Sequence, residues 1–423
     1  MTSKINAITT GAGGIEVTGD SSGEIEFQAD GSTIATITSS GLSLTGTLPI
    51  ADGGTGQSTA SDARTALGLE IGTDVQSYDA NTAKYNDTTA NFTGTLQTSG
   101  NQVATQNALG VRNLIINGNF DIWQRGTSIS LSGSAYTADR FKVGAASGSF
   151  ARQSFTLGQT EVPNEPSYYG RWTINSNSQN YEVHQRIEDV RTLAGQTATL
   201  SFYARRPSGS TTINARIVQY FGTGGSPSST VVTSLGTVAL TTDWQKFTFT
   251  VNVPSISGKT LGTDNNHSLW VGVQITDTNT GTIDFSQIQF EKGDIATPFE
   301  HRPYDMELAR CQRYYVKWLV PTNTGIGATT WATAVSTTLA DGVIFLPTTM
   351  RTASPSLTVN SLQYYISTTS GTGSSGTWSL AYATNDKVKV IRYTHGSGVF
   401  TAGTAIAFTG NGASGYLALD GEL

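Results

Sequence analysis

The chain has 423 residues, of which only 13% are charged, while glycine contributes 47 residues and proline 11. So few charges argue against a helix-rich enzyme and favour an all-β protein, in which small polar side chains line closely packed strands. The net charge of −6 excludes the basic surface expected of a protein that binds nucleic acid or an anionic membrane.

Cysteine usage and hydropathy exclude further classes of protein. The single cysteine, Cys311, excludes an intrachain disulfide framework and a metal site with several thiolate ligands. Neither a signal peptide nor a run of about 18 apolar residues that could cross a bilayer is present. We therefore expect a protein that is made in a reducing cytosol and inserts into no membrane.

Residues 1–47 contain short alternating segments separated by glycine turns. Residues 24–28 and 33–38 alternate with period two, and an Asp30-Gly31 turn lies between them. These strands supply few apolar side chains, and a few isolated strands are marginally stable in water. We expect other copies of the same chain to complete their core. A flexible tail is the alternative.

Residues 48–111 predict a thin shaft or linker. A glycine-rich turn precedes a short helix expected over 58–67, with Ser58 as its N-cap and a narrow apolar stripe. The glycine run is no phosphate loop, because no Gly-Lys-Ser/Thr follows it. Residues 70–111 are polar and irregular.

Residues 112–303 predict an antiparallel jelly-roll β-sandwich. Aromatic-rich strands recur there between glycine, serine and proline turns, with almost no helical period. Three tryptophans, Trp172, Trp244 and Trp270, fall within strands, and we expect them in the core.

The clearest helix of the sequence is expected over 304–317. Asp305 would be its N-cap, and Tyr315 would share its buried face. A second β-rich unit follows over 318–423 and forms the C-terminal tip.

Several segments resemble proteins of one family. Residues 42–69, with the run Asp52-Gly53-Gly54-Thr55-Gly56, resemble a motif common in tail fibre proteins of tailed bacteriophages. Residues 112–126 and 138–141 resemble the opening of a jelly-roll domain found in many phage fibres, which is similar in outline to carbohydrate-binding modules. The stretches that resemble its closing segments and a fibre tip are 287–303, 307–315 and 347–355.

The resemblance implies an elongated homotrimeric fibre on a virion, made in the host cytoplasm. Residues 1–47 would attach it to other tail or baseplate proteins, and residues 318–423 would contact a glycan receptor on the host surface. Two alternatives remain open. One is a purely structural head or collar decoration fibre, and the other is a tailspike that cleaves polysaccharide.

We expect no enzymatic activity and no catalytic residues. The four histidines lack zinc-site spacing, and no Gly-x-Ser-x-Gly elbow occurs. A glycosidase needs two carboxylates, but acids at such distances also occur by chance in a β domain. No repeat of the kind that builds a solenoid spike is visible. The carboxylates considered are Glu182, Glu188, Asp189, Asp284 and Glu291.

Glycan binding would depend on aromatic side chains, because sugar rings stack on the faces of tryptophan and tyrosine. In the C-terminal unit several aromatic residues flank polar, glycine-rich turns, although packing between copies explains them equally well. These candidate ligand-binding residues are Trp331, Tyr364, Tyr365, Trp378 and Tyr393.

No cofactor is expected apart from a structural calcium ion, which the resemblance allows near the beginning and end of the jelly roll. By resemblance, Asn117, Asp121 and Asp284 would supply its oxygen ligands. The alternative is that these side chains only cap turns.

Overall fold

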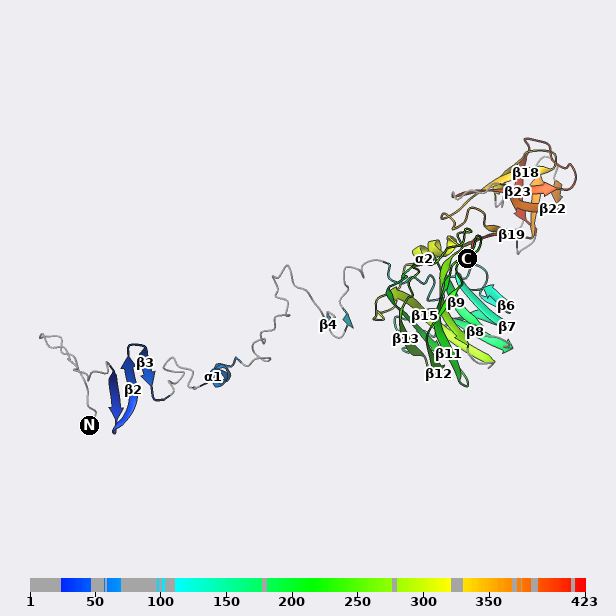
Figure 1. Cartoon of the computed structure of the whole chain (residues 1–423). Coiled ribbons are helices and arrows are strands. Elements are labelled where there is room, and N and C mark those ends of the chain that lie inside the picture. The colour runs from blue at the N-terminus through cyan, green and yellow to red at the C-terminus, as the bar shows by residue number, and fades with distance from the viewer. Residues whose placement is uncertain are drawn as a thin grey trace. The chain divides into compact units, whose positions relative to one another are not determined.

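The computed structural model describes two compact units, which fall within residues 1–103 and 104–423. Strands dominate both units (Figure 1), so the expected all-β fold is confirmed. No helix among the described residues is long and apolar enough to span a membrane. The described residues are 24–46, 57, 59–69, 97–98, 101–102, 111–176, 181–275, 280–320, 330–366, 371–373, 375–381, 387–411 and 415–423.

The first unit contains a small amphipathic sheet in which none of the strand residues is buried. Its register pairs Ile25 with Ile37 and Phe27 with Ala35, and then Ile37 with Leu42, so that apolar side chains gather on one face. Among the described residues of this unit, no segment covers that face. The three antiparallel strands are β1 (Ile25–Ala29), β2 (Ser32–Thr38) and β3 (Gly41–Leu44).

A short helix, α1 (Ala60–Ala66), lies within the expected range 58–67. Its N-cap is Thr59 rather than Ser58, because the Thr59 hydroxyl accepts a hydrogen bond from the Asp62 backbone N–H at 3.1 Å. Two short strands, β4 (Gln97–Thr98) and β5 (Asn101–Gln102), pair with each other. The remainder of the expected shaft lies largely outside the described residues.

The second unit begins with a ten-stranded jelly-roll sandwich. Strands β12, β11, β14 and β9 form one layer, here called layer A, and strands β8, β15, β10 and β13 form layer B. The strands are β6 (Ser128–Tyr136), β7 (Phe141–Ser154), β8 (Tyr168–Ser176), β9 (Glu182–Glu188), β10 (Thr197–Arg205), β11 (Thr211–Tyr220), β12 (Val231–Leu240), β13 (Gln245–Asn252), β14 (Ser268–Ile275) and β15 (Gly281–Lys292).

The long strand β7 joins the two layers. Its residues 141–143 pair with β9, whereas residues 147–154 pair with β8, and β6 pairs along its other edge. Alternation along each strand directs one set of side chains between the layers, where they form a continuous core. The largest fully buried hydrophobic side chains of that core are Phe120, Phe141, Phe150, Trp172, Phe202, Phe285 and Phe290.

The three sandwich tryptophans have different environments. Trp172 lies in the main core, as expected, and is fully buried. Trp244 is buried in a separate small cluster with Val162 and Tyr169. Trp270 contradicts the expectation, because it is only half-buried and lies on the outer face of layer A.

Helix α2 (Tyr304–Gln312) follows the sandwich and is shorter than expected. Its N-cap is Pro303, with no side-chain cap, so the expected role of Asp305 is wrong. Tyr315 does not extend the helix but begins β16, where it pairs with Asp420 of β25.

The C-terminal β region, residues 315–423, contains two sheets. One has the order β16-β25-β19, and the other has the order β21-β20-β24-β17-β18-β23-β22. The strands are β16 (Tyr315–Leu319), β17 (Thr330–Ala334), β18 (Leu339–Phe345), β19 (Ser356–Asn360), β20 (Leu362–Ile366), β21 (Gly371–Gly373), β22 (Gly376–Leu380), β23 (Val388–His395), β24 (Ala405–Gly410) and β25 (Tyr416–Asp420).

A buried ion-pair network joins this region to the sandwich. Glu422 pairs with Arg140, and the two side chains are 3% and 1% exposed. Arg125 pairs with Asp420 at 2.9 Å, and Tyr136 donates a hydrogen bond to the carbonyl of Leu423 at 2.7 Å. Residues 420–423 are therefore fixed to β6 and to the loops that precede β6 and β7.

We expect the substitution Glu422→Gln to lower the free energy of unfolding by about 3–5 kcal/mol, because it leaves the Arg140 guanidinium buried without its counter-charge. Chemical denaturation of the full-length protein measures this change. The exposed Glu161→Gln is the control and should change stability by less than about 0.5 kcal/mol. Equal stabilities of the two variants would contradict the role of the network.

Candidate functional site

The seven-stranded sheet of the C-terminal β region has one buried and one open face around β24. Ile406 of β24 faces Ala332 on one side and Ile366 on the other, and all three are buried. The next residue, Ala407, points to the opposite face and lies between Trp331 and Tyr365. This open face is the candidate site.

Trp331 is the most accessible aromatic ring of the candidate site, with 61% of its surface exposed. Tyr365 is half-buried two strands away, which places the two backbones about 10 Å apart. Ala407 is only 4% exposed, and its methyl group forms the floor between the two aromatic side chains. Ala407 is therefore flanked on the open face by an aromatic residue on each neighbouring strand.

The neighbouring strand β18 extends the open face. Val343 and Phe345 alternate with the buried Gly342 and Ile344, so they lie on the same face as Trp331. Phe345 is 73% exposed. Further along β18, the Asp341 carboxylate accepts hydrogen bonds from Arg392 at 2.7 and 2.8 Å. Apolar side chains thus lie beside a fixed group of polar ones.

The other three candidate ligand-binding residues do not join this face. Tyr364 and Tyr393 are 6% and 0% exposed and belong to a buried cluster. Trp378 is half-buried, and its ring lies 4.8 Å from that of Tyr393 and 4.7 Å from that of Phe408. Their side chains point to the opposite side of the sheet from Trp331, so these three are packing residues rather than stacking platforms.

The three residues expected to hold calcium are not assembled into one site. The Asn117 side chain bonds the backbone of Ile122 and Asp139. The Asp284 carboxylate is fully buried and is held by Arg171 at 2.7 Å and Arg205 at 3.0 Å. No group of three or more His, Cys, Asp or Glu side chains in the described part of the chain could hold a metal ion.

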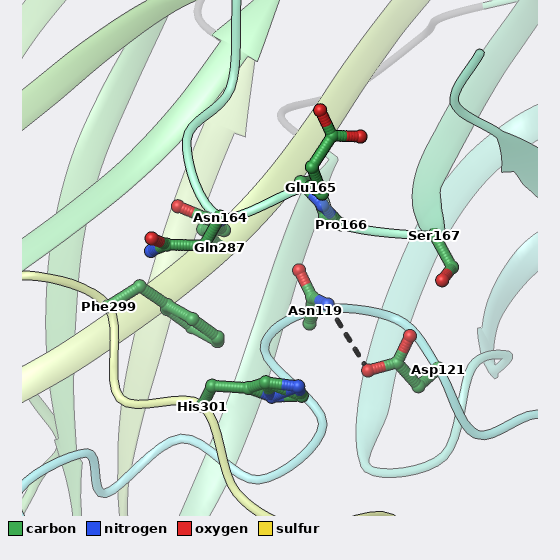
Figure 2. A pocket seen from close by; sticks show the side chains of 9 residues that line it. All are labelled: Asn119, Asp121, Asn164, Glu165, Pro166, Ser167, Gln287, Phe299 and His301. Atoms are coloured by element: carbon green, nitrogen blue, oxygen red, sulfur yellow. Dashed lines mark hydrogen bonds between the residues drawn. The ribbon is translucent and has the colours of Figure 1, made fainter. Parts of the chain in front are cut away.

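Asp121 lies instead in a small polar hollow at the side of the sandwich (Figure 2). It accepts a hydrogen bond from Asn119 at 3.2 Å. Burial raises the pKa of the Asp121 carboxyl, while Asn119 and His301 act to lower it. Figure 2 shows Asn119, Asp121 and His301 on one side of the hollow and the segment Asn164–Ser167 on the other. Gln287 and Phe299 complete the lining.

The remaining carboxylates considered for hydrolysis have structural partners. Glu182 pairs with Arg216, and Glu188 pairs with Arg313 at 2.9 Å. Glu291 accepts hydrogen bonds from Thr297, and Asp189 lies near Arg191 and His267. Each of these carboxylates thus has a basic or hydroxyl side chain as a neighbour.

The outer face of layer A is a second surface of interest, which the sequence analysis missed. Trp270 lies there opposite Arg186, whose Cζ is 4.1 Å from the ring centroid. His184 stacks beside the indole, with a centroid distance of 5.3 Å and an angle of 19° between the rings. Tyr220 contacts the same indole at 5.4 Å. The strand context of Trp270 gave no indication of which face it would occupy.

His184 is buried and uncharged in this stack. Burial lowers the pKa of its imidazole well below the usual 6.5, and the charges of Arg186, Lys142 and Arg216 lower it further. Glu182 Oε1 lies 3.2 Å from Nδ1 without forming a hydrogen bond. The neutral imidazole therefore serves as a support for Trp270.

We expect the free energy of unfolding to fall as the pH is lowered below about 6.5, because the unfolded chain then binds a proton at His184 that the folded chain excludes. The slope from this group approaches about 1.4 kcal/mol per pH unit. The variant His184→Gln should lose this component in denaturation measured between pH 7 and 5, whereas the exposed His301→Gln should retain it. An unchanged pH dependence in His184→Gln would contradict the assignment.

No family model and no curated protein matches the chain. Solved structures to which part of the chain is similar include a CBM4 module, which is 21% identical and covers 42% of this chain and 98% of its own, with a TM-score of 0.24. The CBM22-2 xylan-binding domain of Paenibacillus barcinonensis Xyn10C is 12% identical over 43% of this chain and 99% of its own, with a TM-score of 0.28. The enzymatically active domain of bacteriophage CBA120 tailspike protein 4 is 10% identical over 43% of this chain and 21% of its own, with a TM-score of 0.28. Matches this remote do not identify a ligand.

Proposed function

We propose that the chain is an adhesion protein, a bacteriophage tail fibre whose C-terminal β region binds a glycan on the host surface without cleaving it. The observation that carries this proposal is the open sheet face on which Trp331 and Tyr365 flank Ala407. Aromatic rings held apart on a rigid sheet suit the apolar faces of sugar rings. Hydrogen bonds to the sugar hydroxyls would come from nearby polar side chains such as Thr333 and Asp341.

The exposure of the site indicates weak individual contacts. Trp331 and Phe345 are 61% and 73% exposed, so a ligand on this face would remain in contact with solvent. Linking several copies of such a site raises the overall affinity, because the second and third binding events become intramolecular. Adhesion through this face therefore requires several copies on one particle.

The uncovered sheet of the first unit supports such an assembly. Its apolar face carries Ile25, Phe27, Ile37, Leu42 and Leu44, which are each about 39–63% exposed in the single chain. A single-layer sheet can bury such a face only against another element or another copy. In the proposal three copies bury these faces against one another, and residues 1–47 attach the trimer to other virion proteins.

We expect Trp331→Ala to weaken binding to the host surface polysaccharide about fivefold or more, the equivalent of about 1 kcal/mol per site. Binding is measured with the full-length protein and the isolated polysaccharide, and the polymer length is measured in parallel. Because Trp331 is exposed, the melting temperature should not change. Tyr365→Ala should weaken binding to a similar extent.

Tyr364→Ala is the matched control, since it removes the adjacent tyrosine from the buried face and should lower stability instead. Unchanged binding in both Trp331→Ala and Tyr365→Ala would contradict the site. Shortening of the polysaccharide would favour a hydrolase. A complete absence of binding to a sensitive host would favour a decoration fibre.

We expect the purified protein to have a mass about three times 44.6 kDa in light scattering. Phe27→Asp should weaken the association, because it places a charge in the centre of the shared apolar face. Glu26→Gln changes the adjacent residue on the polar face and is the control. A folded monomer of the unmodified protein would contradict the proposed assembly.

A further inference from the structure

A row of side chains crosses the outer face of the jelly roll from β6 to β11. The register places Tyr136 opposite Lys142, Lys142 opposite His184, His184 opposite Gly272, and Gly272 opposite Arg216. In the next row Arg186 lies opposite Trp270. Lys142 and Arg186 are thus diagonal neighbours across β7 and β9, within reach of one common group.

The positive charges in this area are only partly compensated. Arg216 is paired with Glu182, to which its Nε donates at 3.0 Å. Glu422, the other acid near Lys142, is already paired with Arg140 and Arg125. Among the described residues, no Asp or Glu side chain forms an ion pair with Lys142 or Arg186.

Lys142 and Arg186 also retain unused hydrogen-bonding capacity. Arg186 donates from one terminal nitrogen to a main-chain oxygen of Leu423 at 2.7 Å, and its buried Nε has no partner. Lys142 Nζ lies 5.6 Å from the Tyr136 ring centroid. Burial lowers the pKa of Lys142, and the charge of Arg186 lowers it further. An anion between the two cations would relieve this repulsion.

Aromatic groups lie directly beside the cations. The Trp270 indole is fixed by His184 and by a hydrogen bond from its Nε1 to Ser268 Oγ at 2.9 Å. Tyr220 lies against the indole, and both rings are only half-buried. A ligand with an apolar ring face next to a negative group matches this combination. A simple inorganic anion matches it less well, because it has no apolar face to pack against the two aromatic rings.

We propose that this surface, defined by Lys142, Arg186, Trp270 and Tyr220, is a second binding site, which takes a carboxylate-bearing sugar such as a uronic or sialic acid. The carboxylate lies between the Lys142 ammonium and the Arg186 guanidinium. The sugar ring lies against Tyr220 and the exposed part of Trp270. Charge-assisted hydrogen bonds of this kind are stronger than neutral ones.

The test uses the full-length protein with two acidic probes, oligogalacturonate and oligosialic acid, and with the carboxyl-reduced form of each. At least one acidic probe should bind, its reduced form should bind at least about tenfold more weakly, and raising the salt concentration should weaken the acidic complex. Lys142→Met should lower the affinity for the acidic probe about tenfold. Lys246→Met, which removes an exposed lysine of β13 in layer B, should not change it.

Two further variants keep the test decisive. Tyr220→Ala should weaken binding of the acidic probe without loss of its salt dependence, and Trp331→Ala should leave that binding unchanged. The site is therefore tested independently of the glycan site in the C-terminal β region. The proposal is overturned if neither acidic probe binds, if Lys142→Met binds as tightly as the unmodified protein, or if inorganic phosphate competes as well as the acidic sugar does.

Discussion

The buried pair of Glu422 and Arg140 is the interaction on which the arrangement of the second unit depends. Arg140 lies under the Tyr314 ring, with Cζ 3.3 Å from the centroid, and it also donates to the carbonyl of Arg186 at 2.5 Å. The Arg125 guanidinium lies against the Tyr315 ring in the same way, with Cζ 3.7 Å from the ring centroid. Residues far apart in the sequence are thereby held at one point, where α2, β16 and residues 420–423 meet the sandwich. A buried charge that has lost its partner lowers the free energy of unfolding strongly. We therefore expect Arg140 and Glu422 to become buried together.

The same alternation of side chains produces both the core and the two candidate binding surfaces. Tyr364 and Tyr365 are neighbours in β20, yet one packs inside and the other lies on the open face. In β14, Val271 faces the core while Trp270 faces outwards. The packed side of each sheet fixes the strands, so the backbone positions of the outward-facing aromatic residues are fixed as well. Adhesion by such surfaces needs no loop rearrangement.

The sequence was sufficient to predict the all-β fold and the presence of both helices, because period-two patterns and glycine turns depend on local chemistry. It could not predict which face of a strand a given aromatic residue occupies, as Trp270 and Tyr393 demonstrate, since both faces of these sheets carry large side chains. The end of α2 at Gln312 was also missed. There, pairing of Tyr315 with Asp420, more than a hundred residues later, overrides the local helical pattern. The ion pair of Arg140 with Glu422 could not be predicted either, because the two residues lie far apart in the sequence and no local pattern connects them.

The central claim is that the C-terminal β region binds a host glycan through its open sheet face. Hydrogen exchange of the full-length protein with and without the host polysaccharide tests this claim most directly. Our account predicts that the polysaccharide slows exchange in β17, β20 and β24, the strands that carry Trp331, Tyr365 and Ala407, while the buried strands of layer B are unaffected. Protection confined to other parts of the chain, or identical exchange in both samples at saturating polysaccharide, would contradict it.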